Sequence, residues 1–94
     1  SYVRSRSVVS VSLLESAQVE AVEVILESGA PAEGIPLMKA GLPAECLVGA
    51  YVRNETTHIP DGRSILAAGD RVIILIRTPC SAKVLPYFKG RKSL

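Results

Sequence analysis

Hydrophobic residues along the chain alternate with polar ones or gather in short runs, a pattern that favours strands over long helices. In residues 19–27 (VEAVEVILE), the alternating Val22, Val24 and Leu26 indicate a strand. Val19, Val22 and Leu26 also fit helical spacing, so the periodicity alone leaves both alternatives open. The many β-branched residues favour the strand.

Two further segments predict strands more strongly. Residues 46–53 (CLVGAYVR) contain Gly49, which indicates a bulge or a close backbone approach within the strand. Residues 71–77 (RVIILIR) carry a continuous apolar run, typical of a central strand covered on both faces. Residues 54–55 form the turn of a predicted hairpin that returns over residues 56–59.

A weaker strand signal lies near the start, in the Ser-rich residues 1–12. Val9, Val11 and Leu13 alternate with serines, the period-2 pattern of a half-buried strand. The pattern fits either a tether or the last strand of a preceding domain.

Two short helices complete the prediction. Residues 35–41 (IPLMKAG) place a proline at the first helical turn and a glycine at the C-terminal cap. A second helix is expected to begin with Thr78 as N-cap and Pro79 at the first position. Pro86 lies inside its apolar stripe and predicts a helix that is short or kinked there. The fold class is therefore α+β: a small, mostly antiparallel sheet with two helices in the order β-α-β-β-β-α.

Composition and charge narrow the class of protein. The chain has 94 residues, enough for one domain, and Leu, Ile, Val and Phe supply an aliphatic core. No apolar run approaches the length of a membrane-spanning helix. The net charge of +2 is too small to indicate a nucleic-acid-binding protein. Basic residues gather at the end, where residues 90–94 form a basic tail that either contacts phosphate or an anionic membrane, or is simply solvated.

Candidate chemistry is sparse. Cys46 and Cys80 lie among apolar neighbours and are expected to be free thiols in a reducing compartment. With His58 they make three possible zinc ligands, fewer than the four of a structural zinc site, so we expect no metal site. Asp61 and Asp70 lie in predicted turns. No glycine-rich phosphate loop is present, and we expect no catalytic residues; a binding or regulatory module is favoured over an enzyme.

Four short motifs follow one another between Gly34 and Phe88: G-I-P-L-x-x-x-G-L-P, L-V-G-A-Y-V-R, I-P-D-G and L-x-A-G-D-R-V-I. Their order and spacing resemble the TrkA-C domain, the C-terminal half of the RCK (regulator of potassium conductance) module. The upstream residues 8–23 are similar to the junction that precedes this domain in TrkA potassium-uptake proteins. The resemblance divides the chain into a junction (1–18), a TrkA-C regulatory domain (19–89) and the basic tail (90–94).

The resemblance implies a cytoplasmic homodimer at the inner face of the membrane, beside an integral-membrane potassium transporter subunit. It implies regulation of potassium uptake, with NAD or ATP bound only by an N-terminal half that this sequence lacks. Cyclic di-AMP binds at the dimer interface of some related domains. The corresponding candidate ligand-binding residues here are Val52, Arg53, Asn54, His58 and Pro60. Alternatives are the same module in another ion transporter or a transcription regulator, a plain interaction domain, or a small enzyme built around the single histidine.

Overall fold

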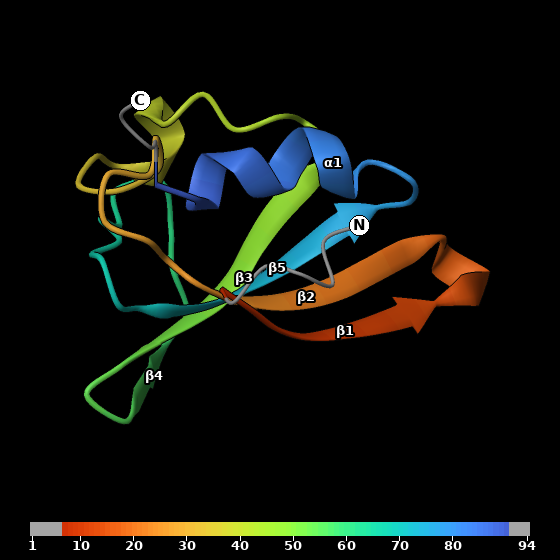
Figure 1. Ribbon diagram of the computed structural model, residues 1–94, viewed down its shortest axis with the longest axis horizontal. Coiled ribbons are helices and arrows are strands. Elements are labelled where there is room, and N and C mark those ends of the chain that lie inside the picture. The colour runs from red at the N-terminus through yellow and green to blue at the C-terminus, as the bar shows by residue number, and fades with distance from the viewer. Residues whose placement is uncertain (1–6, 91–94) are drawn as a thin grey trace.

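Five β-strands form an antiparallel sheet in the structure, a computed structural model that describes residues 7–90 (Figure 1). The strands lie in the order β1-β2-β5-β3-β4 across the sheet. The elements are β1 (Val8–Leu14), β2 (Val19–Ile25), β3 (Cys46–Arg53), β4 (Thr56–His58), β5 (Arg71–Arg77), the α-helix α1 (Ser81–Val84), and the 3-10 turns η2 (Glu15–Ala17), η3 (Leu37–Lys39) and η4 (Leu85–Phe88).

The predicted strands are confirmed. β2, β3 and β5 fall on the three segments singled out by their β-branched residues, and β4 returns from a turn at Asn54 and Glu55, both with positive φ. The register between β3 and β5 shifts between Val48 and Ala50, so Gly49 does mark a bulge. The N-terminal strand signal is β1, which pairs antiparallel with β2 at the edge of the same sheet, so residues 8–14 are neither a tether nor a strand of a preceding domain.

The hydrophobic core lies on one face of the sheet, under α1 and η4 (Figure 1). Ile74 of β5 lies between Val22 of β2 and Val48 of β3, and all three side chains are buried. Leu85 and Phe88 of η4 join this cluster and are buried as well. The buried apolar residues of β2, β3 and β5 therefore face the same cover, which fixes the register of these three strands.

The opposite face of the sheet is less covered. Ile73 and Leu75 of β5 alternate with its buried residues and are only half-buried. β5 is central, as its apolar run predicts, but the expectation that both its faces are covered is wrong. α1 and η4 both lie on one side of the sheet (Figure 1), and the described chain is too short to supply a second layer of helices.

The prediction of an α-helix over residues 35–41 is wrong. Residues 35–41 contain only η3, because so few residues between a proline and a glycine cannot nucleate an α-helix. The backbone N–H groups of Leu37 and Met38 instead donate to the carbonyl oxygens of Ser64 and Gly62, each at 2.9 Å. The two-helix order is thus not confirmed: residues 7–90 contain one short α-helix together with 3-10 turns.

The second helix forms, but its start differs from the prediction. Cys80 is the N-cap of α1, and Thr78 lies outside it. The Thr78 backbone N–H and hydroxyl both donate to the Gln18 carbonyl oxygen, at 2.9 and 3.0 Å, and so tie the start of this segment to the β1–β2 turn. α1 ends at Val84 and continues as η4, which contains Pro86; the predicted shortness is confirmed.

Candidate ligand site at the β3–β4 hairpin

The hairpin between β3 and β4 brings an aromatic ring and an imidazole together. A two-residue turn places His58 of β4 directly opposite Tyr51 of β3. Their rings are stacked, with centroids 4.8 Å apart and planes 19° apart. Tyr51 is buried, whereas His58 is only half-buried. The more exposed ring of the stack is therefore the imidazole.

Arg53 extends this cluster at the end of β3. Its guanidinium carbon lies 5.1 Å from the centroid of the Tyr51 ring. Its Nε and Nη2 donate to the two carboxylate oxygens of Asp70, at 2.8 and 2.6 Å. Nη2 also donates to the carbonyl oxygen of Ile65 at 3.1 Å. The two hydrogen bonds to Asp70 thus hold the guanidinium in one orientation. Paired hydrogen bonds of this kind orient arginine side chains at recognition sites.

The Asp70 carboxylate is the anchor of this contact. Its side chain is only 3% exposed and also accepts the backbone N–H of Ala67 at 2.8 Å. Burial by itself would raise the pKa of Asp70, but the hydrogen bonds from Arg53 and Ala67 and the Arg53 charge hold it below its ordinary value. The hydrogen bond with Asp70 in turn raises the pKa of Arg53. Both groups are therefore charged at neutral pH.

The Arg53 guanidinium does not use all of its hydrogen-bond donors. Its Nη1 has no hydrogen-bond partner among residues 7–90, and the side chain is 38% exposed. An arginine fixed at two nitrogens and open at the third can donate to an anion without first losing side-chain freedom. Arg53 and the half-buried imidazole of His58 both contact the Tyr51 ring, and together they form a small basic and aromatic cluster suited to a phosphate or a nucleobase.

The structure brings two of the five predicted site residues together and leaves three apart. Arg53 and His58 both contact Tyr51. Val52, between Tyr51 and Arg53 in β3, points to the other face of the sheet. Asn54 is exposed in the turn, while Pro60 lies beyond β4. Within residues 7–90, none of these three residues forms a side-chain hydrogen bond, ion pair or ring contact with Tyr51, Arg53 or His58.

Pro60 instead lines a neighbouring groove of about 410 Å³. Its other walls are mainly apolar and come from η3, the segment after it and β3; they include Met38, Leu42 and Leu47. Asp61 and Gly62 complete the rim. The groove therefore adjoins the hairpin without including its charged groups.

Tyr51 and Asp70 are the residues of the cluster that the sequence analysis did not select. The Tyr51 position follows from the predicted two-residue turn, because counting back from it places Tyr51 opposite His58. Asp70 was interpreted as a turn residue and, in the alternative of a small enzyme, as a polar partner of His58 and Asp61. Its partner Arg53 lies 17 positions earlier, and no local pattern links the two.

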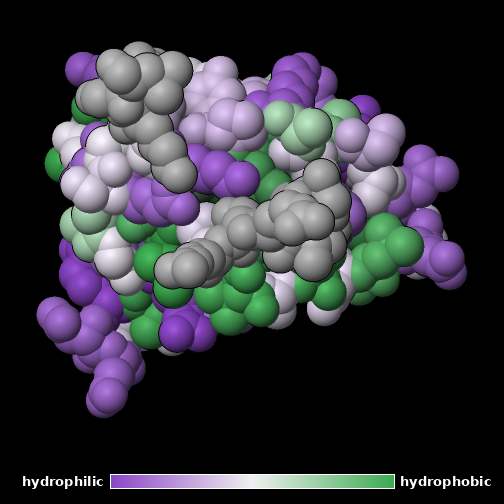
Figure 2. Space-filling model, in the orientation of Figure 1, coloured by the Kyte–Doolittle hydropathy of each residue, from purple (hydrophilic) through white to green (hydrophobic). Residues whose placement is uncertain are grey.

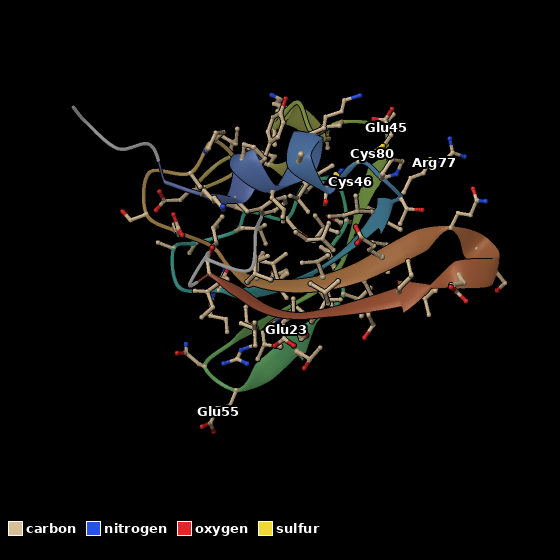
Figure 3. All side chains as sticks on the ribbon, turned by 45° about the vertical axis from the view of Figure 1, so that its right-hand side comes forward. Glu23, Glu45, Cys46, Glu55, Arg77 and Cys80 are labelled. Atoms are coloured by element: carbon tan, nitrogen blue, oxygen red, sulfur yellow. The ribbon has the colours of Figure 1, made fainter. Side chains whose placement is uncertain are left out.

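The two cysteines lie at the other end of the sheet from the hairpin tip (Figure 3). Both thiols are free and half-buried, and burial raises the pKa of Cys46. Glu45, beside Cys46, accepts a hydrogen bond from Lys83 at 3.0 Å. Within residues 7–90 no three His, Cys, Asp or Glu side chains gather in a metal-binding arrangement. No helix in that range is long and apolar enough to cross a membrane.

A match to the family model of the TrkA-C domain covers residues 21–89, which include β3, β4, β5 and all but the first two residues of β2, while β1 lies outside the match. The chain belongs to the TrkA-C domain family. It is 31% identical over 84 residues to the Trk system potassium uptake protein TrkA homolog 1 of Methanosarcina mazei, covering 89% of this chain and 19% of that protein. It is also 31% identical over 70 residues to the TrkA homolog of Archaeoglobus fulgidus, covering 74% of this chain and 16% of that protein. The chain thus spans under a fifth of the length of these relatives.

Proposed function

We propose that the chain is a regulatory domain of a potassium uptake system. The domain senses a small anionic nucleotide at the β3–β4 hairpin, and the conformation that the ligand favours regulates a membrane transporter. Membership of the TrkA-C family, with relatives named as Trk potassium uptake proteins, supports the class of system. In this proposal residues 19–89 are the regulatory domain, residues 1–18 the junction to a nucleotide-binding half, and residues 90–94 a basic tail. The domain acts in the cytoplasm at the inner face of the membrane.

The observation that carries the ligand proposal is the open nitrogen of Arg53. Asp70 fixes the guanidinium while Nη1 stays without a partner among the described residues, and the half-buried His58 stacks on the same Tyr51 ring that Arg53 contacts. This arrangement favours a ligand with both a phosphate and a nucleobase, and cyclic di-AMP is the candidate. Val52, Asn54 and Pro60 would then border the site rather than form its centre. The domain itself carries out no reaction, and nucleic acid is not its partner.

Regulation requires two arrangements of the domain that bind the ligand differently. We propose a homodimer, in which a ligand that prefers one arrangement of the two copies shifts the population toward it. The integral-membrane transporter subunit then responds to that shift. The coupling is limited by the difference in binding free energy between the two arrangements, which is typically 1–3 kcal/mol, that is, roughly 5–150-fold in affinity.

Thermal unfolding in the presence of cyclic di-AMP, ATP or NAD tests the ligand proposal. A ligand that binds only the folded domain raises its Tm in proportion to ln(1 + [L]/Kd). We expect a shift with cyclic di-AMP and a smaller one or none with NAD and ATP. His58→Ala should weaken the shift, because it removes the exposed part of the ring stack without breaking the Arg53–Asp70 pair.

Arg63→Ala is the matched control. Arg63 is an exposed arginine whose side chain has no recorded partner in the described part of the chain, and its loss lowers the positive charge of the domain without touching the cluster. The shift should be unchanged in this variant. Equal weakening by both substitutions would mean that the shift does not depend on the ring stack of the hairpin, and no shift in the parent domain would contradict the proposed sensing.

A further inference from the structure

The strand β1 presents a free edge along one side of the sheet. It pairs with β2 on its inner side and is the last strand of the sheet in the described chain (Figure 1). The opposite edge is β4, which is only three residues long and is followed two positions later by Pro60. A short strand ended by a proline is a common way to block edge pairing. β1 has seven residues and no proline.

β1 also lacks the charges that usually protect an edge. Its sequence, VVSVSLL, contains no ionisable side chain. Val9, Leu13 and Leu14 are 42%, 55% and 49% exposed, and hydrophobic surface follows the position of β1 along the lower margin of Figure 2. Two glutamates of the neighbouring strand lie opposite β1: Glu23, opposite Ser10, is neutralised by Arg71 at 3.0 Å, whereas Glu20, opposite Leu13, has no ion pair within residues 7–90. A bulge between Val8 and Ser10 is the one edge-blunting feature within β1.

The sequence of β1 is symmetric in polarity about Val11. Ser10 and Ser12 flank Val11, and beyond them two apolar residues follow on each side. If two copies of β1 run antiparallel with their Val11 residues opposite each other, Ser10 of one copy lies opposite Ser12 of the other. Valine and leucine then lie opposite one another as well. Residues directly opposite share a face of the sheet, so like meets like along the contact up to the bulge between Val8 and Ser10.

We propose that a second copy of this chain binds along β1, by antiparallel β1–β1 pairing centred on Val11. The inference rests on the homodimer proposed above and names the surface at which its copies meet. A two-fold axis at Val11 makes the contact isologous and joins the two sheets into one, with the covered faces of both copies on the same side. The pairing satisfies the free backbone groups of both edges and covers the exposed leucines and valines.

Charged substitutions at the two serines test this register. Ser10 and Ser12 are exposed, so lysines at these positions leave the buried core intact. In the double variant S10K/S12K each lysine lies opposite a lysine of the other copy. Like charges directly opposite destabilise a strand pair, and we expect the dimer Kd, measured by sedimentation equilibrium, to rise about tenfold or more.

The charge-swap variant S10K/S12E restores the contact. With the two-fold axis at Val11, each lysine lies opposite a glutamate of the other copy, so the dimer should be at least as tight as the parent. A two-fold axis at Ser12 would instead place the glutamates opposite each other and weaken the dimer. The matched control is T56K/T57K, which adds the same charge to two exposed residues of the other edge strand, β4, and should leave the dimer unchanged.

Thermal unfolding of each variant confirms that the monomer is folded before its dimer Kd is compared. A dimer that tolerates S10K/S12K, or a charge swap that fails to restore it, overturns the β1 contact and leaves the proposed homodimer to another surface. A parent domain that stays monomeric at all concentrations also overturns the contact. In that case a Tm shift with cyclic di-AMP would still support the proposed sensing, so the two failures are distinguishable.

Discussion

Arg53 and Asp70 form a two-point ion pair that joins the end of β3 to the residue just before β5. The Nε–Oδ1 and Nη2–Oδ2 distances are 2.8 and 2.6 Å. One partner is almost fully buried and the other is 38% exposed, so the carboxylate is held inside the fold while the guanidinium reaches the surface. The pair therefore links the packing of the sheet to the hairpin at which we propose the ligand binds.

Loss of this pair should destabilise the domain. Asp70→Asn removes the charge and leaves the Arg53 guanidinium with a weaker acceptor, and it weakens the hydrogen bond from Ala67. Because Arg53 stays partly hydrated, we expect a loss of about 1–3 kcal/mol in the free energy of unfolding, measured by urea denaturation. Asp61→Asn is the control: Asp61 is exposed and its Oδ1 acceptor is retained in asparagine. Equal losses in both variants would contradict a special role for the pair.

The same pair predicts how stability depends on pH. The pKa of Asp70 is lower in the folded chain than in the unfolded chain, so the folded state binds fewer protons. Its stabilisation is complete above about pH 4 and is lost as the pH falls through the lowered folded pKa. The Asp70→Asn variant should therefore lose less stability than the parent in this acid range. The hydrogen bond from Lys83 lowers the pKa of Glu45 as well, but this effect on stability is the same in the parent and in the variant. If the urea midpoints of the parent and of Asp70→Asn fell in parallel as the pH is lowered, Asp70 would not be the source of this pH dependence.

Gly90 should not tolerate a side chain. Its backbone N–H donates to Glu27 Oε1 at 2.7 Å, and a Cβ on Gly90 would overlap the carbonyl oxygen of Ser28. Gly90→Ala should cost about 1–3 kcal/mol in the free energy of unfolding. The matched control is Gly49→Ala, because a Cβ there would meet the Ile73 carbonyl oxygen at an ordinary 3.7 Å and Gly49 has no positive φ. Denaturant unfolding that ranks the two variants in the opposite order would contradict the packing described here.

The turn η4 should be essential to the core. Phe88 is 1% exposed and is the bulkiest of the fully buried side chains. Phe88→Ala leaves a cavity under the sheet, and we expect a loss of about 3–5 kcal/mol in the free energy of unfolding. Met38→Ala serves as a comparison, because Met38 is 63% exposed and its truncation should change stability little. A similar small effect at Phe88 would mean that η4 is not packed as described.

The strands could be predicted from sequence because their signal is local. β3 and β5 contain β-branched residues in runs of strand length, and nothing else in those windows competes. The prediction of a helix over residues 35–41 failed because capping residues indicate where a helix can end. They do not indicate whether the segment between them is long enough to form one. In residues 35–41 the backbone donors found partners in a distant segment, residues 61–66, which local propensity does not reveal.

The candidate site was predictable only in part. Arg53 and His58 were selected through the family resemblance, and the hairpin geometry brings both onto Tyr51. The contact with Asp70 depends on how β3 and the turn before β5 meet in three dimensions, so no spacing in the sequence encodes it. Val52 was selected through the same resemblance, although alternate residues of a strand face opposite ways.

The most direct test of the central claim is isothermal titration of cyclic di-AMP into the purified domain, with its oligomeric state measured in the same buffer. The account predicts saturable binding with one ligand per two chains, weakened in His58→Ala and unchanged in Arg63→Ala. Absence of binding heat at millimolar ligand over a range of temperatures, together with no change in Tm, would contradict the claim that this domain is a nucleotide-sensing regulator.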